Sequence, residues 1–159
     1  MRTFVLGAIA FVSLVCGGCI PSSPSVPETL VTEGYDEAEM DAAIARARSE
    51  IDIFIAELAA GNGTDFGVKA PIEDNGEVEH FWLTDVTYSD GTFEGLIGND
   101  PGMVRNVTFG QKWKISKTEI SDWTFMRDGK MHGNYTLRPL LKTMPDEEAE
   151  MYRSMLAEP

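Results

Sequence analysis

The side chains best suited to chemistry in this sequence are its two histidines, His80 and His132. With a carboxylate nearby, the pair could bind a metal ion or serve as acid and base. Their spacing follows no metal-ligand pattern, so a hydrogen-bonded structural histidine is the simpler interpretation of each. We therefore predict no metal and no other cofactor.

Further candidates lie in the segment 120–136, where polar and aromatic side chains are densest. Side chains on a strand alternate between its two faces, so Asp122 should face away from Trp123 and Arg127. The turn that follows gathers four polar side chains, and one interpretation is a ligand or peptide site at the tip of a hairpin. The other is turn chemistry, in which aspartate and asparagine bond the backbone and glycines take positive φ. The full set of candidate binding residues is His80, Trp82, Asp122, Trp123, Arg127, Asp128, Lys130, His132 and Asn134.

Motifs that would name a reaction are missing from the sequence. There is no glycine-rich phosphate loop, no Gly-x-Ser-x-Gly nucleophile turn, no His-Glu-x-x-His motif and no helix-loop-helix calcium loop. Paired carboxylates such as Glu77 and Glu79 are common in a chain with 26 acidic residues, and we expect them on a solvated strand face. We predict that the protein is not an enzyme.

The elements that must position these candidates follow an α+β order. Apolar residues recur every three or four positions across 35–60, which predicts one long N-terminal helix that ends at Gly61. Alternating residues predict an antiparallel sheet of about five strands. The strands are expected over 65–72, 77–88, 92–98, 112–116 and 120–126. C-terminal helices are expected at 137–142, capped by Thr136, and at 146–156, on the same side of the sheet as the first.

The N-terminal segment is typical of an export signal. Arg2 precedes an apolar run over 4–15 that is too short, at about 1.5 Å per residue, to span a bilayer as a helix. The layout predicts a signal peptide over 1–18. Its Gly-Gly-Cys19 end resembles the lipobox of bacterial lipoproteins, although Cys16 stands where leucine is usual. We expect lipidation of Cys19, with plain secretion and an uncleaved anchor as the alternatives.

Residues 19–34 are expected to form a tether between the lipidated cysteine and one α+β domain over 35–159. Proline and serine crowd positions 20–27, which disfavours both helix and strand. Ile20 follows the cysteine, and in the enterobacterial sorting pattern a residue other than aspartate there favours the outer membrane, facing the periplasm. The expected location is therefore the cell envelope.

Charge is distributed unevenly along the chain. The sequence holds 26 acidic and 13 basic residues, a net charge of −13, which argues against nucleic acid as a partner. Residues 101–143 are the exception, with eight bases against three acids. These bases either pair with the acidic remainder of the domain or form a local site for an anionic group.

Three stretches resemble a known family: Glu-His-Phe-Trp-Leu at 79–83, Ile-Ser-Asp-Trp at 120–123, and Asp-Gly-Lys-Met-His-Gly-Asn-Tyr-Thr-Leu-Arg at 128–138. Together they resemble the bacterial domain-of-unknown-function family 2314, also called YegJ-like, over about Asp36 to Leu156. The resemblance implies a small bacterial α+β domain, sometimes exported. The family has no assigned activity, so no catalytic residue is carried over.

The expected function is a membrane-tethered, non-enzymatic binding or structural domain of the bacterial cell envelope. Its expected partners are the membrane, through the lipid anchor, and a protein. Two alternatives stay open. One is an immunity protein or inhibitor that neutralises a toxin through its acidic surface. The other is a small envelope hydrolase that uses His80, His132 and nearby acids.

Overall fold

The computed structural model describes residues 34–158. The predicted signal peptide at 1–18, Cys19 and nearly all of the predicted tether lie outside the described residues. Within 34–158, no helix is both long enough and apolar enough to cross a membrane.

Two helices replace the single long helix that the periodicity predicts. Helix α1 spans Glu37–Ser49, capped by the Asp36 side chain, and α2 spans Ile51–Ala60 and ends at Gly61 in the left-handed conformation. Between them, Glu50 leaves helical geometry with φ −105° and ψ 7°. The break lies where the indole N–H of Trp123 donates to the Ala47 carbonyl, a contact from a distant strand that local periodicity does not encode.

Six antiparallel strands form one sheet in the order β4-β3-β2-β1-β5-β6. They are β1 Thr64–Asp74, β2 Glu77–Ser89, β3 Thr92–Ile97, β4 Lys112–Ser116, β5 Asp122–Arg127 and β6 Lys130–Gly133. The hairpins turn at 75–76, 90–91 and 128–129, where both central residues have positive φ, as two-residue hairpin turns require. The α+β class is therefore confirmed, and β6 is the strand that the sequence prediction missed because its four residues lie in a segment dominated by turn signals.

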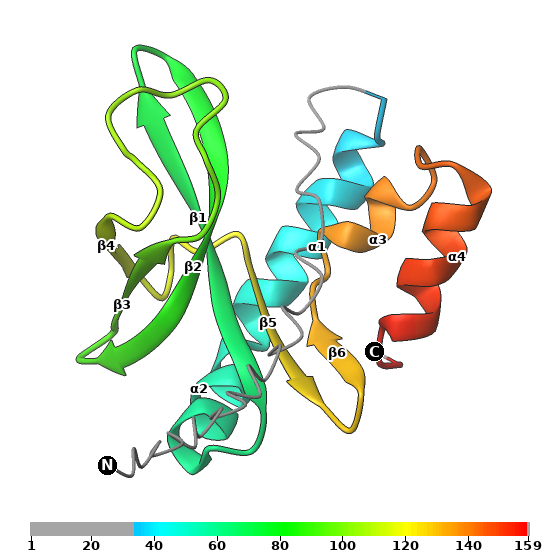
Figure 1. Ribbon diagram of the computed structural model, residues 1–159, viewed down its shortest axis with the longest axis horizontal. Helices are drawn as coiled ribbons and strands as arrows, with labels where there is room; N and C mark the ends of the chain where they lie inside the picture. Colours follow the sequence, from blue (N-terminus) through cyan, green and yellow to red (C-terminus); the bar gives the residue numbers. More distant parts are fainter. Residues whose placement is uncertain (1–33, 159) are drawn as a thin grey trace, which may run out of the picture.

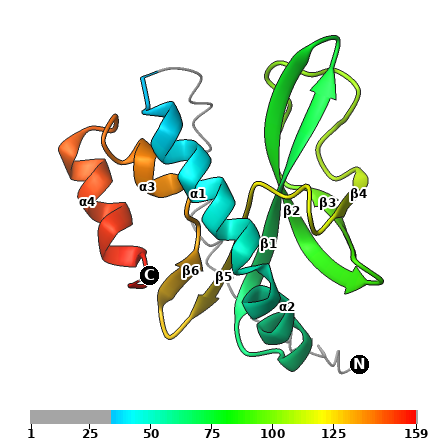
Figure 2. The same ribbon diagram turned by 180° about the vertical axis from the view of Figure 1, so that it is seen from behind.

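One face of the sheet packs against α1 and α2, which follow one another end to end in Figures 1 and 2. Ala47, Ile51 and Phe54 of the helices are buried and belong to the core. The Phe54 ring lies 5.7 Å from the Trp123 ring and 6.4 Å from that of Phe125. Those two side chains of β5 therefore face the helices.

Helices α3 (Leu137–Leu140) and α4 (Asp146–Met155) lie beside the β6 end of the sheet (Figure 1). Their small apolar cluster is Leu141, Ala149, Tyr152 and Leu156. The backbone amide of Ala157 donates to the Met131 carbonyl at 2.8 Å, so the C-terminal segment covers the outer edge of β6. The predicted Thr136 cap of α3 is wrong: the side chain makes no capping bond, because its hydroxyl bonds Asp122.

Most bases of the 101–143 segment pair with acids of other segments. Lys117 pairs with Asp52, Arg127 with Glu57 and Lys142 with Glu39, all on α1 or α2, while Lys112 and Lys114 share Glu94 of β3. The first interpretation of the uneven charge, internal pairing, is therefore confirmed for these five bases. Exposed pairs of this kind contribute little to stability but reduce self-repulsion.

Candidate functional site

The structure distributes the candidate residues over three places instead of one hairpin tip. His80, Trp82 and Asp122 face away from α1 and α2, on what we call the open face of the sheet. Trp123, Arg127 and His132 face the helices. Asp128 lies in the β5–β6 turn, Lys130 begins β6 and Asn134 follows it.

Asp122 binds the segment that follows β6 through hydrogen bonds. Its side chain is fully buried. One carboxylate oxygen accepts the amides of Trp123 and Tyr135 at 2.8 and 3.1 Å, and the other accepts the amide and hydroxyl of Thr136, both at 2.7 Å. Burial raises the pKa of Asp122, while Lys69 and these donors act in the opposite direction. Four donors saturate the acceptor sites of a carboxylate, so Asp122 positions the loop and has no lone pair to offer a ligand.

His80 forms a close pair with Ser121, whose Oγ lies 2.8 Å from His80 Nδ1. His80 is exposed to solvent at the residue level, yet desolvation by the surrounding atoms lowers its pKa to about 4, and the positive charges of Lys69 and Arg48 act in the same direction. The imidazole is therefore neutral at pH 7 and is held by hydrogen bonding. Ser121 is itself buried, which leaves little room for an attacking hydroxyl.

Lys69 is the open-face residue that sequence reasoning missed. Its Nζ lies 4.7 Å from the centre of the Trp82 ring, a cation–π distance, and donates to the Thr136 hydroxyl at 3.0 Å. A signal was present in the sequence, since a lysine between Val68 and Ala70 in an alternating strand must face away from the core. The structure thus adds Lys69 to the predicted Trp82.

A cleft of about 1210 Å³ includes this face and extends to residues of α1, α2 and α3, among them Met40, Leu58 and Leu140. Six of the side chains that line it stand on or next to the central strands: Lys69, His80, Trp82, Thr84, Thr124 and Thr136. The loop after β3 forms one wall through Asn99, whose side chain accepts the backbone amide of Trp82 at 3.2 Å, and α3 contributes Leu137 to another. The cleft combines an aromatic ring, a cation and neutral hydroxyls.

Glu79 holds the loop that forms that wall. The sequence prediction of a solvated carboxylate is wrong here, because Glu79 is 3% exposed. Its carboxylate accepts the backbone amides of Gly102, Met103 and Val104 at 2.8–3.2 Å. Burial alone would raise the pKa of Glu79, but these three amides outweigh it and leave the pKa below its usual value. The carboxylate is a structural clamp.

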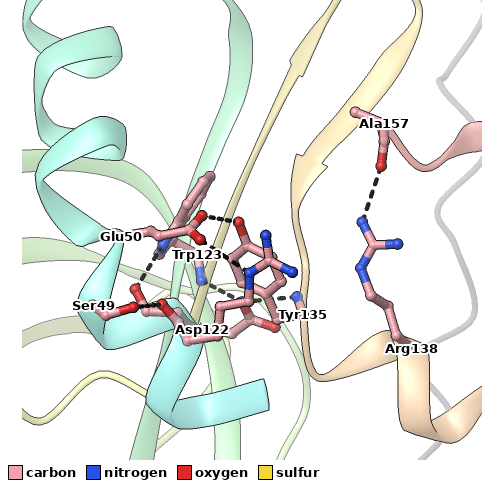
Figure 3. Close-up of polar contacts among 9 residues, drawn as sticks. Ser49, Glu50, Asp122, Trp123, Tyr135, Arg138 and Ala157 are labelled. Carbon is pink, nitrogen blue, oxygen red and sulfur yellow. Dashed lines mark hydrogen bonds and ion pairs between the residues drawn. The ribbon is translucent and has the colours of Figure 1, made fainter. Parts of the chain in front are cut away.

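On the helix side, the candidates pack among aromatic and charged neighbours. His132 stacks on Phe125 with ring centres 4.9 Å apart, and burial, aided by Arg127, lowers its pKa. Arg127 pairs with Glu57 at 3.0 Å. Figure 3 shows the adjacent junction, where Tyr135 of the loop after β6 points toward Glu50 at the helix break.

The residues of the β5–β6 turn bond to their surroundings and do not converge on a common point. Asp128 and Gly129 both have positive φ, as the turn-chemistry interpretation requires. Lys130 donates to the carbonyl of Ser154 at 2.7 Å, and the Asn134 side chain donates to the sulfur of Met131. No group of three histidine, cysteine or acidic residues in the described part of the chain is arranged to hold a metal.

Comparison with known proteins finds bacterial relatives of this chain. Residues 37–157 match the family described as "Uncharacterized protein conserved in bacteria (DUF2314)". Over 131 residues the chain is 55% identical to "Uncharacterized protein YegJ" of Escherichia coli (strain K12), an alignment that covers 82% of this chain and 86% of that protein.

The chain also resembles a protein of a second organism over a shorter length. It is 35% identical over 86 residues to the "Putative ankyrin repeat protein" of Neisseria meningitidis serogroup B (strain ATCC BAA-335 / MC58), an alignment that covers 51% of this chain and 34% of that protein. No solved structure matches the chain. The family match includes all three stretches that carry the sequence resemblance, which is thereby confirmed.

Proposed function

The chain belongs to the DUF2314 family of uncharacterised bacterial proteins, and from this premise we propose that it is a membrane-tethered, non-enzymatic binding domain of the cell envelope. The observation that carries the binding role is the open-face cleft with its Lys69–Trp82 pair. The tether is supported by the lipobox-like end at Cys19 and the proline- and serine-rich residues after it.

The residues exposed on the open face favour a segment of a partner protein as the ligand. Trp82 is half-buried and offers a flat apolar surface, while Lys69 and the exposed Thr84 beside it offer polar contacts. Aromatic anchors among polar groups are typical of protein-binding surfaces.

The side chains that could support catalysis have structural partners instead. Asp122 is saturated by four donors, His80 is paired with Ser121, and His132 is stacked on Phe125. These engagements support a binding role over a catalytic one.

One observation favours the hydrolase alternative, namely the 2.8 Å contact between His80 Nδ1 and Ser121 Oγ. A serine paired with a histidine is the core of many acyl-transfer sites. The two functions are distinguished by Ser121→Ala: a hydrolase would lose its cellular phenotype with partner capture intact, whereas a binding domain would keep both.

Membrane attachment is tested by fractionating cells that produce the full chain. Cys19→Ser should move the protein from the membrane fraction to the soluble periplasmic fraction and abolish incorporation of labelled palmitate. Cys16→Ser is the matched control, because that cysteine lies three residues upstream and would leave with the signal peptide. Retention of Cys19→Ser in the membrane would contradict the tether.

The binding role is tested by photo-crosslinking in living cells. A crosslinking residue at Thr84, exposed in the cleft, should yield a defined adduct with a partner protein, and Trp82→Ala should weaken that adduct. Ala56, exposed on α2, is the control position and should yield none. Adducts of equal yield at both positions, or none at either, would refute a partner site in the cleft.

A further inference from the structure

A second cavity, of about 160 Å³, lies on the helix side of the sheet and serves no role derived so far. It opens between the α1–α2 break, strands β5 and β6, and the C-terminal residues. Its charged and polar lining comprises Glu50, Glu57, Arg127, His132, Tyr135, Arg138 and Glu158. A void of this volume exceeds what a single water molecule needs.

Two charged side chains in this cavity carry buried atoms that lack a hydrogen-bond partner within residues 34–158. They are Glu57 Oε2, an acceptor, and Arg138 Nε, a donor. Glu57 Oε1 accepts from Arg127 at 3.0 Å, and the Glu57 side chain also bonds that of Asn62. Arg138 Nη2 donates to the Ala157 carbonyl at 3.0 Å, the contact drawn in Figure 3, and the guanidinium carbon lies 5.9 Å from the centre of the Tyr135 ring. Buried polar atoms are nearly always satisfied in native proteins, so a matched pair of opposite kind in one cavity points to a ligand.

The charge balance of the lining selects the chemistry of that ligand. Three acids (Glu50, Glu57 and Glu158) and two bases (Arg127 and Arg138) line the same space, so a simple anion or a simple cation would meet like charge there. A small molecule with a carboxylate at one end and an ammonium at the other meets opposite charge on both sides. Guanidinium groups bind carboxylates in a forked geometry, which suits the side of Arg138 that faces away from Ala157.

We propose that this cavity binds a small zwitterion of the α-amino acid class, with its carboxylate at Arg138 and its ammonium at Glu57. Trp123 and Phe125 supply the apolar wall, and the cavity size restricts the side chain to the smallest ones. The site is independent of the open-face cleft, because β5 presents Trp123 and Phe125 to one side and Thr124 to the other.

Binding is tested by titrating the protein with glycine, L-alanine, D-alanine and L-serine, followed by calorimetry and by NMR. The signals to observe are the backbone amide of Gly133 and the indole N–H of Trp123, which belong to the lining. We expect saturable shifts at these two groups. Acetate and methylamine, each carrying half of the ligand, should bind at least about tenfold more weakly.

Two variants and two matched controls decide the assignment. Glu57→Gln and Arg138→Gln should each weaken binding at least about tenfold. Asp52→Asn removes an acid of α2 outside the cavity, and Lys130→Gln removes a base that bonds the same C-terminal segment through Ser154, so both should bind like the native protein.

The proposal is overturned if none of the four amino acids binds saturably, which would assign the cavity to water, or if binding survives in Glu57→Gln. Because Arg138 also holds Ala157, its variant is checked for folding by circular dichroism, and Glu57→Gln decides the question should Arg138→Gln not fold.

Discussion

Gly133→Ala is the substitution with the sharpest expected outcome. Gly133 ends β6 in the left-handed region at φ +73°, and a Cβ there would lie 2.3 Å from the Trp123 carbonyl oxygen and 2.4 Å from its ring atom Cε3. Neither neighbour can move freely. The Trp123 carbonyl accepts the Asn134 amide at 2.8 Å, and its indole donates to Ala47 at 2.9 Å. The added methyl group must therefore displace a pinned aromatic residue.

Gly129 is a matched control because it has the same φ of +73° and nothing within 4 Å of an added Cβ. The left-handed backbone costs an alanine about 1–2 kcal/mol at either position. At Gly133 the overlap adds about 3 kcal/mol, the upper part of the usual range for overpacking. The free energy of unfolding should thus fall by about 4–5 kcal/mol for Gly133→Ala and by about 1–2 kcal/mol for Gly129→Ala.

The assay is urea and thermal unfolding followed by circular dichroism. At about 4 °C per kcal/mol for a domain of this size, Tm should fall by about 16–20 °C for Gly133→Ala and by about 4–8 °C for the control. The expectation is also met if the Gly133→Ala protein is insoluble while the Gly129→Ala protein folds. If the free energies of unfolding of Gly133→Ala and Gly129→Ala fall by amounts that agree within about 0.5 kcal/mol, the reasoning is refuted, because Trp123 must then move to accommodate the methyl group.

Four further predictions concern Asp122, Glu79, Tyr135 and His80. Asp122→Asn places an amide where Thr136 donates, so the free energy of unfolding in urea should fall by about 2–4 kcal/mol. Asp128→Asn on the exposed turn should change that free energy by no more than about 0.5 kcal/mol. Glu79→Gln should lower stability by about 1.5–3 kcal/mol and speed hydrogen exchange at the amides of 102–104; unchanged exchange there would contradict the clamp. Tyr135→Phe removes the hydroxyl that donates to Glu50 and should cost about 1–2 kcal/mol by thermal unfolding, against a smaller loss for Tyr88→Phe. Because the pKa of His80 is lowered from 6.5 to about 4, the unfolded chain binds more protons between these values. The stability due to neutral His80 is therefore present above pH 6.5 and lost as the pH falls toward 4. The free energy of unfolding should fall more steeply over this range in the native protein than in His80→Gln. An NMR titration of His80 with a midpoint near 6.5 would disprove the prediction.

Much of the secondary structure was predictable because it depends on neighbouring residues. The turn at 75–76 is Asn-Gly, whose residues tolerate positive φ, and the adjoining strands alternate in burial as their sequences do. The helix at 146–155 begins with acids after Pro145, a local pattern that the structure keeps. The interruption at Glu50 was not predictable, since it coincides with contacts from Trp123 and Tyr135.

The candidate site was predictable only in part. Alternation correctly separates Asp122 from Trp123, yet it does not say that both will be buried. Nor does it indicate that His80 will meet Ser121, 41 positions later in the chain. Lys69 was recoverable from the same alternation, but only its register with Trp82 and Asp122 makes it part of a site.

The sequence by itself determines the α+β order of elements, the family, the acidic balance and the basic segment within it, because each is a property of composition or of short patterns. Tertiary structure alone decides what the polar groups do. Glu79 becomes a clamp through amides at least 23 positions away, and Glu50 meets a hydroxyl 85 positions away. The physical reason is that a buried charge is tolerated only where donors converge on it, and the sheet register and helix packing bring those donors together from distant segments.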